Sequence, residues 1–306
     1  MAILTGTDCT TNRLGTGMES CQVIEGLPSG LILTPKGWSL NKTSGTFDKA
    51  YVQEQIQAGL FVPMVNCFDA VAETPDPTTE ESQSGLMSVV RQGKPTLTFT
   101  FKEGLAGHKA RYSYNSNNQY DALLVFESGV IWCAETVDGT AIKGFSIGML
   151  DTGGYQLNNG TNSASSVLKM QIVNPQEYNQ YAFPLSGLDF NPNTELNGIT
   201  DVKLTGTADA LLSEAHISAT WLHNEQFNFT FFTASNFKLT VDGSTATIDT
   251  VTYNTTTKKY EIVPGVAFTA SQVVVVQLYD SGESVACVKV GDKFYRGTSP
   301  SITVTA

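Results

Sequence analysis

Short segments in which apolar and polar residues alternate recur along this chain, and they constrain its fold more than any other feature. Residues 96–101 alternate with a period of two, and so do residues 167–173, where Leu168, Met170 and Ile172 form the apolar face. Such alternation is typical of a strand that buries one of its two faces. The pattern predicts a mainly β protein.

Turn residues separate these segments. Residues 121–126 and 130–134 flank Glu127-Ser-Gly129, which predicts a β-hairpin, and Val137-Asp-Gly139 precedes a strand expected over residues 141–147. Helical patterns are scarce. The best helix candidate covers residues 48–58, with Asp48 as N-cap and Gly59 at the end, and a short second helix is possible within residues 102–112.

The composition changes after residues 191–198, which resemble a linker because they are rich in Asn and Pro. This predicts two domains, residues 1–196 and residues 197–306. In the second, strand-like runs recur every ten residues or so, as in an antiparallel sandwich. These runs cover residues 201–205, 217–221, 226–232, 237–241, 246–253, 260–263, 273–279 and 285–290.

The second domain therefore has the length and the strand count of one immunoglobulin-like sandwich. Its single cysteine, Cys287, excludes the inter-sheet disulfide of antibody domains. The core has to be apolar instead. The residues expected in that core are Trp221, Phe229, Phe231, Ile248, Val274 and Val276.

Charge excludes several classes of function. Only 15% of the residues are charged, and the formal net charge is −11. Binding to nucleic-acid phosphates or to an anionic membrane surface needs a basic face, which this balance does not offer. We find no apolar run of transmembrane length and no secretory signal pattern at the N-terminus, and therefore expect a cytoplasmic place of synthesis and assembly.

One short motif suggests a hydrolase. Gly144-Phe-Ser-Ile-Gly148 matches a nucleophile elbow with Ser146 as the nucleophile, and Asp151, His216 and His223 follow in the required order. An elbow needs a strand that leads into a helix, whereas residues 149–154 are expected to form a turn. A glycine-flanked strand is the favoured interpretation.

A second motif, Asp151-Thr-Gly153, is the tripeptide of aspartic proteases. Such a site needs two carboxylates that share one proton, and the chain has one copy. We interpret it as a chance tripeptide at a turn. Together with the weak elbow, this predicts a protein without catalytic residues.

Metal ligands are not expected either. His108, His216 and His223 are scattered, and Asp201 and Asp242 lack the spacing of a calcium loop. The odd number of cysteines and the absence of a Cys-x-x-Cys pair favour buried reduced thiols over a zinc site or a disulfide framework. The five cysteines are Cys9, Cys21, Cys67, Cys133 and Cys287. No cofactor and no metal is predicted.

Aromatic residues in the second domain allow two interpretations. Phe227, Phe229 and Phe231 share one side of the expected strand, which favours a row that faces the core. Together with Phe232 and Tyr279 they are also the candidates for a glycan-binding face.

Three features together resemble virion structural proteins of tailed phages, particularly tail-tube-like or connector-ring proteins of phages that infect Bacteroidetes. These are the opening Met1-Ala-Ile-Leu-Thr-Gly-Thr-Asp-Cys9, the hairpin and turn over residues 130–145, and the appended immunoglobulin-like domain. The resemblance implies an N-terminal tail-tube-like β-barrel or sandwich with one flanking helix, residues 48–58. It implies no catalytic residues.

The resemblance also implies self-assembly into symmetric rings, with other virion proteins as further partners and DNA passing through a lumen without specific binding. A long loop would reach the neighbouring subunit. The loop over residues 72–84, exposed and without periodicity, is the candidate. Its acidic residues are the expected inter-subunit contacts, Glu73, Asp76, Glu80 and Glu81. The alternatives are a head fibre, decoration or carbohydrate-binding adhesion protein, and a hydrolase that uses Ser146.

Overall fold

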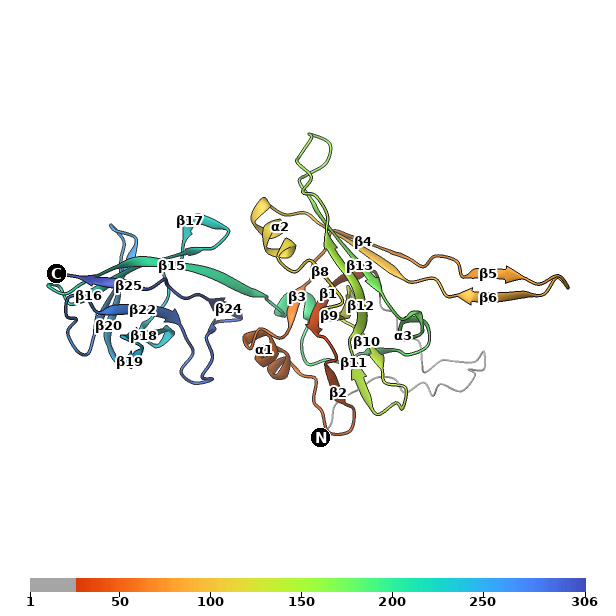
Figure 1. Cartoon of the computed structure of the whole chain (residues 1–306), viewed down its shortest axis with the longest axis horizontal. Helices are drawn as coiled ribbons and strands as arrows, with labels where there is room; N and C mark the ends of the chain where they lie inside the picture. The colour runs from red at the N-terminus through yellow and green to blue at the C-terminus, as the bar shows by residue number, and fades with distance from the viewer. Residues whose placement is uncertain (1–25) are drawn as a thin grey trace. The chain divides into compact units, whose positions relative to one another are not determined.

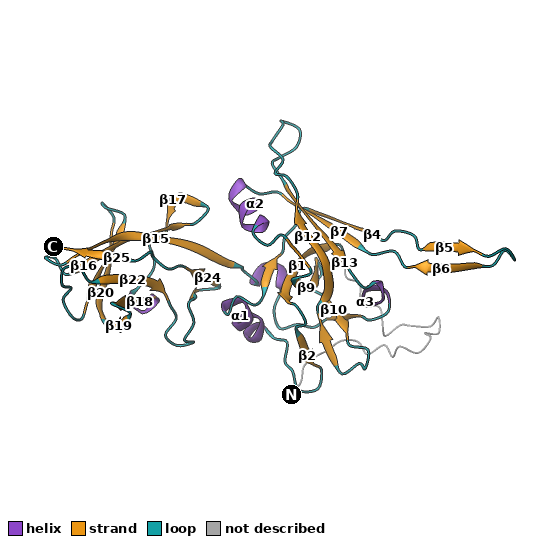
Figure 2. Ribbon diagram, in the orientation of Figure 1, coloured by secondary structure: helices purple, strands orange, loops and turns teal. Residues whose placement is uncertain are grey.

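Strands, most of them paired antiparallel, are the main regular structure of the described residues, as expected for the alternating sequence (Figure 2). The computed structural model describes residues 26–306. The opening motif Met1–Cys9 and the cysteines Cys9 and Cys21 lie outside the described residues. The described chain divides into two compact units, residues 26–55 with 60–196, and residues 56–59 with 197–306. Each unit is described by itself.

The N-terminal unit holds fourteen strands, the helices α2, α3 and α4, and most of helix α1. The strands are β1 Pro28–Pro35, β2 Ser39–Asn41, β3 Val62–Met64, β4 Asp69–Glu73, β5 Thr78–Glu81, β6 Met87–Arg91, β7 Thr96–Phe101, β8 Ser116–Asn117, β9 Tyr120–Phe126, β10 Ile131–Glu135, β11 Ala141–Lys143, β12 Phe145–Thr152, β13 Ser166–Ile172 and β14 Ala182–Leu185. The helices are α1 Lys49–Gln57, α2 Leu105–Tyr112, α3 Pro175–Asn179 and α4 Pro192–Glu195.

Six strand positions of this unit, with β3 and β4 sharing one of them, close into a barrel. Around the ring, β9 pairs with β1, β1 with β3, β4 with β7, β7 with β13, β13 with β12, and β12 again with β9, all antiparallel. The β3–β4 segment bridges the ring, because Cys67 N donates to Ser29 O at 2.8 Å and Phe68 N to Thr100 O at 2.7 Å. Closure leaves few strand edges open in the barrel.

The barrel interior is apolar. The alternating strand β7 is confirmed, and it buries Leu97, Phe99 and Phe101. The expected apolar face of β13 is confirmed as well, because Leu168, Met170 and Ile172 are all fully buried. The period of two in the sequence therefore marks the inward face of the barrel.

Two differences from the expected strands have local causes. Residues 141–147 form two strands, because β11 pairs with β10 while β12 pairs with β9. The break falls at Gly144, where a Cβ atom would lie 2.8 Å from the Cβ of Asp121. Residues 149–152 were expected in a turn but continue strand β12, which pairs with β13 through Leu150 and Met170.

Helix α1 has the predicted position. The side chain of Asp48 accepts a hydrogen bond from Tyr51 N at 2.8 Å, which caps the first turn, and Gly59 has a φ of +75° just past the end. The short second helix expected within residues 102–112 also forms, as α2, and α3 and α4 are single turns.

The C-terminal unit holds the remaining elements. These are β15 Ile199–Asp209, β16 Glu214–Trp221, β17 Asn224–Asn228, η1 Ala234–Asn236, β18 Phe237–Val241, β19 Ser244–Ala246, β20 Ile248–Asn254, β21 Lys259–Pro264, β22 Val273–Leu278, β23 Val288–Val290, β24 Lys293–Arg296 and β25 Ile302–Thr305.

These strands pair as in an immunoglobulin-like sandwich. One sheet has the order β15-β16-β21-β20 and the other β19-β18-β22-β25, which correspond to the A-B-E-D and C-F-G sheets of that fold with one added strand. The end of β15 pairs in parallel with β25 and joins the two sheets. The fold is therefore mainly β in both units, with an immunoglobulin-like sandwich at the C-terminal end.

The core of this sandwich corrects one expectation. Phe229, Val274 and Val276 are buried as predicted, and Trp221 and Ile248 pack against the core from partly buried positions, but Phe231 is 42% exposed. Strand β17 ends at Asn228, so the period of two does not continue through residues 229–232. Phe229 and Phe232 face the core, and Phe227 and Phe231 do not.

Candidate functional site

The proposed nucleophile Ser146 lies on a strand. Its hydroxyl donates to the carboxylate of Glu177 at 3.1 Å, and its backbone N donates to the same carboxylate at 2.8 Å. Lys143 Nζ also pairs with Glu177 at 2.6 Å. The residues after Ser146 continue β12, so the strand-to-helix turn of a nucleophile elbow is missing, and the group that holds Ser146 is a buried acid.

The other catalytic candidates occupy structural positions. Asp151 lies near the end of β12 and accepts a hydrogen bond from Asn115 Nδ2 at 3.1 Å. In the C-terminal unit, the ring of His216 lies 3.7 Å from the Glu214 carboxylate, and His223 stacks edge-on beside Trp221. Each of these groups has a local partner.

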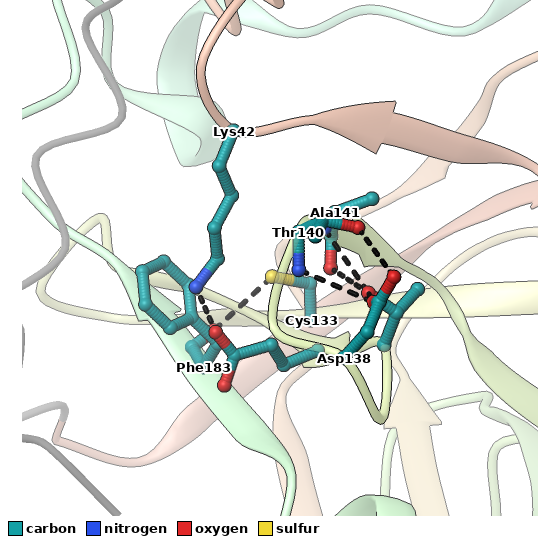
Figure 3. A network of polar contacts seen from close by, with 8 residues as sticks. Lys42, Cys133, Asp138, Thr140, Ala141 and Phe183 are labelled. Atoms are coloured by element: carbon teal, nitrogen blue, oxygen red, sulfur yellow. Dashed lines mark hydrogen bonds and ion pairs between the residues drawn. The ribbon is translucent and has the colours of Figure 1, made fainter.

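Cysteines in residues 26–306 are protonated at neutral pH. Burial raises the pKa of the Cys67 thiol and of the Cys287 thiol to about 11, and raises that of Cys133 further. Figure 3 shows the surroundings of Cys133, whose thiol donates to Phe183 O at 3.2 Å, while Lys42 Nζ lies over the Phe183 ring. A thiolate nucleophile is not available at these three positions.

The turn beside this cluster holds an acid by hydrogen bonds alone. The Asp138 carboxylate accepts hydrogen bonds from the hydroxyls of Thr136 and Thr140, at 2.6 Å and 2.8 Å (Figure 3). These bonds keep the pKa of Asp138 below its ordinary value. Within residues 26–306, no three His, Cys, Asp or Glu side chains gather closely enough to hold a metal ion.

The acidic segment is the part of the molecule that differs most from its expected structure. It was expected as a loop over residues 72–84, but it forms one side of a long β-hairpin in which β5 pairs with β6 (Figure 1). We call residues 74–92 the arm. Glu73 ends β4, Asp76 lies between the two prolines Pro75 and Pro77, and Glu80 and Glu81 lie on β5.

The arm is exposed along its whole length. Every residue from Val71 to Gln92 is exposed, so the rest of the described chain leaves each of these side chains at least partly open to solvent. A turn closes the tip of the arm. In this turn Gly85 has a φ of +78°, and Ser82 Oγ accepts a hydrogen bond from Leu86 N at 3.2 Å. At the base, Gly93 lies so close to Pro75 O that a Cβ atom would collide with it.

The two strands of the arm differ in chemistry. Strand β5 carries Glu80 and Glu81, whereas β6 and the residue before it carry large apolar side chains. These apolar residues are Leu86, Met87, Val89 and Val90, which are 73%, 69%, 54% and 61% exposed. No strand was predicted at these residues. Four apolar residues in five, directly after the turn residues Ser84-Gly85, are the signal that indicates this strand.

An uncovered hairpin of this kind is unusual. An isolated two-stranded hairpin is only marginally stable in water, and exposed apolar groups on a strand promote association. The arm therefore has the properties of an element that is completed by another surface.

The outward face of the neighbouring sheet is also open. On this face of β12, β13, β7 and β4, Asp151 lies opposite Lys169, Lys169 opposite Thr98, and Thr98 opposite Val71. None of the outward residues of β7 is buried, and all three are threonines, Thr96 among them. The face is mostly polar and carries a small excess of acids.

A third open feature lies on the C-terminal unit. Phe227 is 54% exposed, and its ring lies 5.2 Å from that of buried Phe229; the exposed ring of Phe231 lies 5.2 Å from that of Tyr295. These two phenylalanines extend the aromatic core to the surface. Tyr279, the remaining member of the expected glycan-binding face, instead lies under Lys238.

Comparisons of the chain with protein-family models, with curated proteins and with solved structures gave no match. Among residues 26–306, none of the helices combines the length and the apolar character needed to cross a lipid bilayer.

Proposed function

We propose that this chain is a structural subunit of a tailed-phage virion and not an enzyme. In this proposal, copies assemble into a ring or a tube of the tail or of the head–tail connector, through which DNA passes. The N-terminal barrel is the assembly domain, and the immunoglobulin-like sandwich is an appended domain. Assembly takes place in the host cytoplasm.

The observation that carries the proposal is the arm. It extends beyond the barrel with every side chain exposed, and its apolar strand has no cover within the described chain. Apolar surface of this kind is stabilised when another protein surface removes it from water. A long element that reaches a neighbouring subunit is also what the resemblance to tail-tube-like proteins implies.

The open sheet face supports passage of DNA. A conduit has to let a polyanion slide, so a wall rich in lysine and arginine would hold the DNA back. The outward face of β4, β7, β12 and β13 carries threonines together with Asp69, Glu73, Asp151 and Lys169. This weakly acidic, hydroxyl-rich surface suits a lumen wall.

Negative-stain electron microscopy and light scattering of the purified protein test the proposal. We expect closed rings or short tubes of uniform diameter. The matched variant replaces residues 75–94 by an Asn-Gly turn, which joins β4 to β7 directly and should leave a folded monomer. A wild-type protein that stays monomeric at high concentration and moderate salt would contradict the proposal.

One observation favours a second candidate, a carbohydrate-binding adhesion, head-fibre or decoration protein. Phe227 and Phe231 are exposed on the sandwich beside polar residues of β17. A glycan array would give a signal that is lost in the Phe227→Ser, Phe231→Ser variant, while ring assembly persists. No signal in the wild type would leave the aromatic pair without this role.

A further inference from the structure

We propose that the arm of one copy docks on helix α2 of a second copy, with its apolar strand against apolar residues of that helix and its acids beside two lysines. The inference rests on the self-assembly proposed above and adds the surface that receives the arm. We call that surface the α2 face. It consists of Phe68, Lys102, Leu105, Lys109 and Tyr112.

Helix α2 presents one open side. No residue of this helix is fully buried, and Leu105, Lys109 and Tyr112 follow each other at spacings of four and three, which places them on one side. Leu105 is 50% exposed and Tyr112 is 58% exposed. An unpaired amphipathic side of this kind is unusual on a short helix, whose stability comes mainly from packing.

The neighbouring side of α2 is anchored. His108 Nδ1 lies 3.0 Å from Ser166 Oγ, and the Arg111 guanidinium lies over the Phe101 ring and pairs with Glu103. These contacts fix which side of the helix points outward. The ion pair with Arg111 also occupies the Glu103 carboxylate. Glu103 therefore does not compete with the acids of an incoming arm for the lysines of the α2 face.

Lys102 lies three residues before the start of α2 and forms a further exposed pair with Phe68. Phe68 is 63% exposed and bonds through its backbone to Thr100, and Lys102 Nζ lies 3.2 Å from the centre of the Phe68 ring. The α2 face thus combines three exposed apolar or aromatic side chains with two exposed ammonium groups, Lys102 and Lys109.

The arm has the complementary composition. It carries four exposed apolar side chains at Leu86, Met87, Val89 and Val90, and β5 adds two adjacent carboxylates. Glu81 pairs across the hairpin with Met87, and Glu80 with Ser88, so an acid lies beside the apolar strand on each face of the hairpin. Complementary charge beside apolar contacts favours one orientation of docking over others.

The geometry makes this contact intermolecular. The arm leaves the barrel at Thr96, the first residue of β7, whereas α2 follows Phe101, the last residue. Five residues of strand separate these points by about 17 Å, and the arm runs away from α2 (Figure 1). The arm therefore cannot fold onto the helix of its own chain without breaking the β4–β7 pairing.

A contact between opposite ends of the same domain is head-to-tail. Each copy then carries one arm and one α2 face. After each addition, a free arm remains at one end of the assembly and a free α2 face at the other. Heterologous contacts of this type close into rings when the rotation between copies allows it, and otherwise form helical filaments. This is the assembly mode that a ring or tube requires.

Charge exchange tests the docking. We expect the Glu80→Lys, Glu81→Lys variant and the Lys102→Glu, Lys109→Glu variant each to raise the protein concentration at half-assembly by about tenfold or more. A sample that contains all four changes should assemble within roughly threefold of the wild type, because the charges again oppose each other. Lys293→Glu, at an exposed lysine of β24, is the control that changes charge elsewhere.

Cross-linking of the unmodified protein gives an independent result that does not depend on variants folding. A carbodiimide joins carboxylates to amines in direct ion pairs, and a mixture of ordinary and ¹⁵N-labelled protein marks which links join two copies. We expect mixed-label peptides that join Glu80 or Glu81 to Lys102 or Lys109.

The outcomes separate the two proposals. If the wild type assembles, but the charge variants assemble equally well and the cross-links avoid α2, the docking surface is wrong while the virion role stands. If the wild type does not assemble at any concentration, both proposals fail. If the four-change protein stays unassembled although it is folded, the contact is not the charge pairing described here.

Discussion

The apolar strand of the arm is the strongest point at which to perturb this protein. The variant Leu86→Gln, Met87→Gln, Val89→Thr, Val90→Thr keeps side-chain size roughly constant and keeps residues that are compatible with a strand. All four side chains are exposed in the single chain. We therefore expect the variant to fold with an unfolding temperature close to that of the wild type.

Assembly should respond very differently. Full burial of one such side chain contributes about 1.5–3 kcal/mol. Successive side chains of a strand point to opposite faces, so one docking surface covers either Met87 and Val89 or Leu86 and Val90. Each pair is on average about two-thirds exposed, so its burial against a second copy contributes roughly 2–4 kcal/mol for each contact. This corresponds to a change in dissociation constant of about one and a half to three powers of ten. The polar substitutes remove most of this favourable free energy of association.

Sedimentation velocity over a concentration series measures this change, and circular dichroism measures the fold. The control variant Leu211→Gln, Leu212→Gln, Val266→Thr changes three exposed aliphatic residues of the C-terminal unit, which are 84%, 61% and 78% exposed. We expect the control to assemble as the wild type does. An arm variant that is folded and assembles at the wild-type concentration would refute the reasoning.

Two further predictions concern the sandwich. The buried Tyr260 hydroxyl accepts from Phe232 N at 3.1 Å and donates to Phe229 O at 2.9 Å, so Tyr260→Phe leaves two buried backbone groups unpaired and should lower the free energy of unfolding of this unit by about 2–4 kcal/mol in urea titrations. Tyr253→Phe, at a partly buried ring, should cost less than half as much, and equal losses would contradict this role. Burial raises the pKa of Cys287 to about 11 from 9.0, so the folded state keeps a proton that the unfolded state releases, and stability should decline as pH rises from about 9 through 11. Cys287→Ala should flatten this decline in unfolding curves at pH 8 and pH 10.5, and an unchanged slope would show that other groups cause it.

The sequence located features that depend on neighbouring residues. The period of two in β7 and β13 identified both strands and their buried faces, because alternation is set by the backbone of each strand alone. The cap at Asp48 and the glycine after α1 likewise act within one turn of chain. These parts could be predicted for that reason.

Strand β1 shows where this reasoning stops. Its residues are buried on both faces, Leu31 and Leu33 inside the barrel and Ile32 outside it. A strand that is buried on both faces can be apolar at every position. Its sequence therefore lacks the alternation of apolar and polar residues that marks a strand with one solvent-exposed face. Only the completed barrel explains why residues 28–35 are a strand.

The candidate site depended even more on tertiary structure. Residues 73–81 contain two prolines and no apolar period, and a loop was the reasonable expectation. They become part of a hairpin because β6 supplies the hydrogen-bonding partner in register, Glu80 opposite Ser88 and Glu81 opposite Met87. Pairing between segments is a property of two strands together, and neither segment carries it alone.

The sequence by itself thus determined the class of this protein: mainly β, with few charges, a sandwich after residue 197, and no motif whose spacing holds a metal. The tertiary structure decided which segments close the barrel, that Phe231 reaches the surface, and that an acidic segment is one strand of an exposed arm. The physical reason is the separation along the chain over which each kind of interaction acts. Periodicity and capping act within a few residues, whereas closure, burial and register come from contacts between residues far apart in the chain.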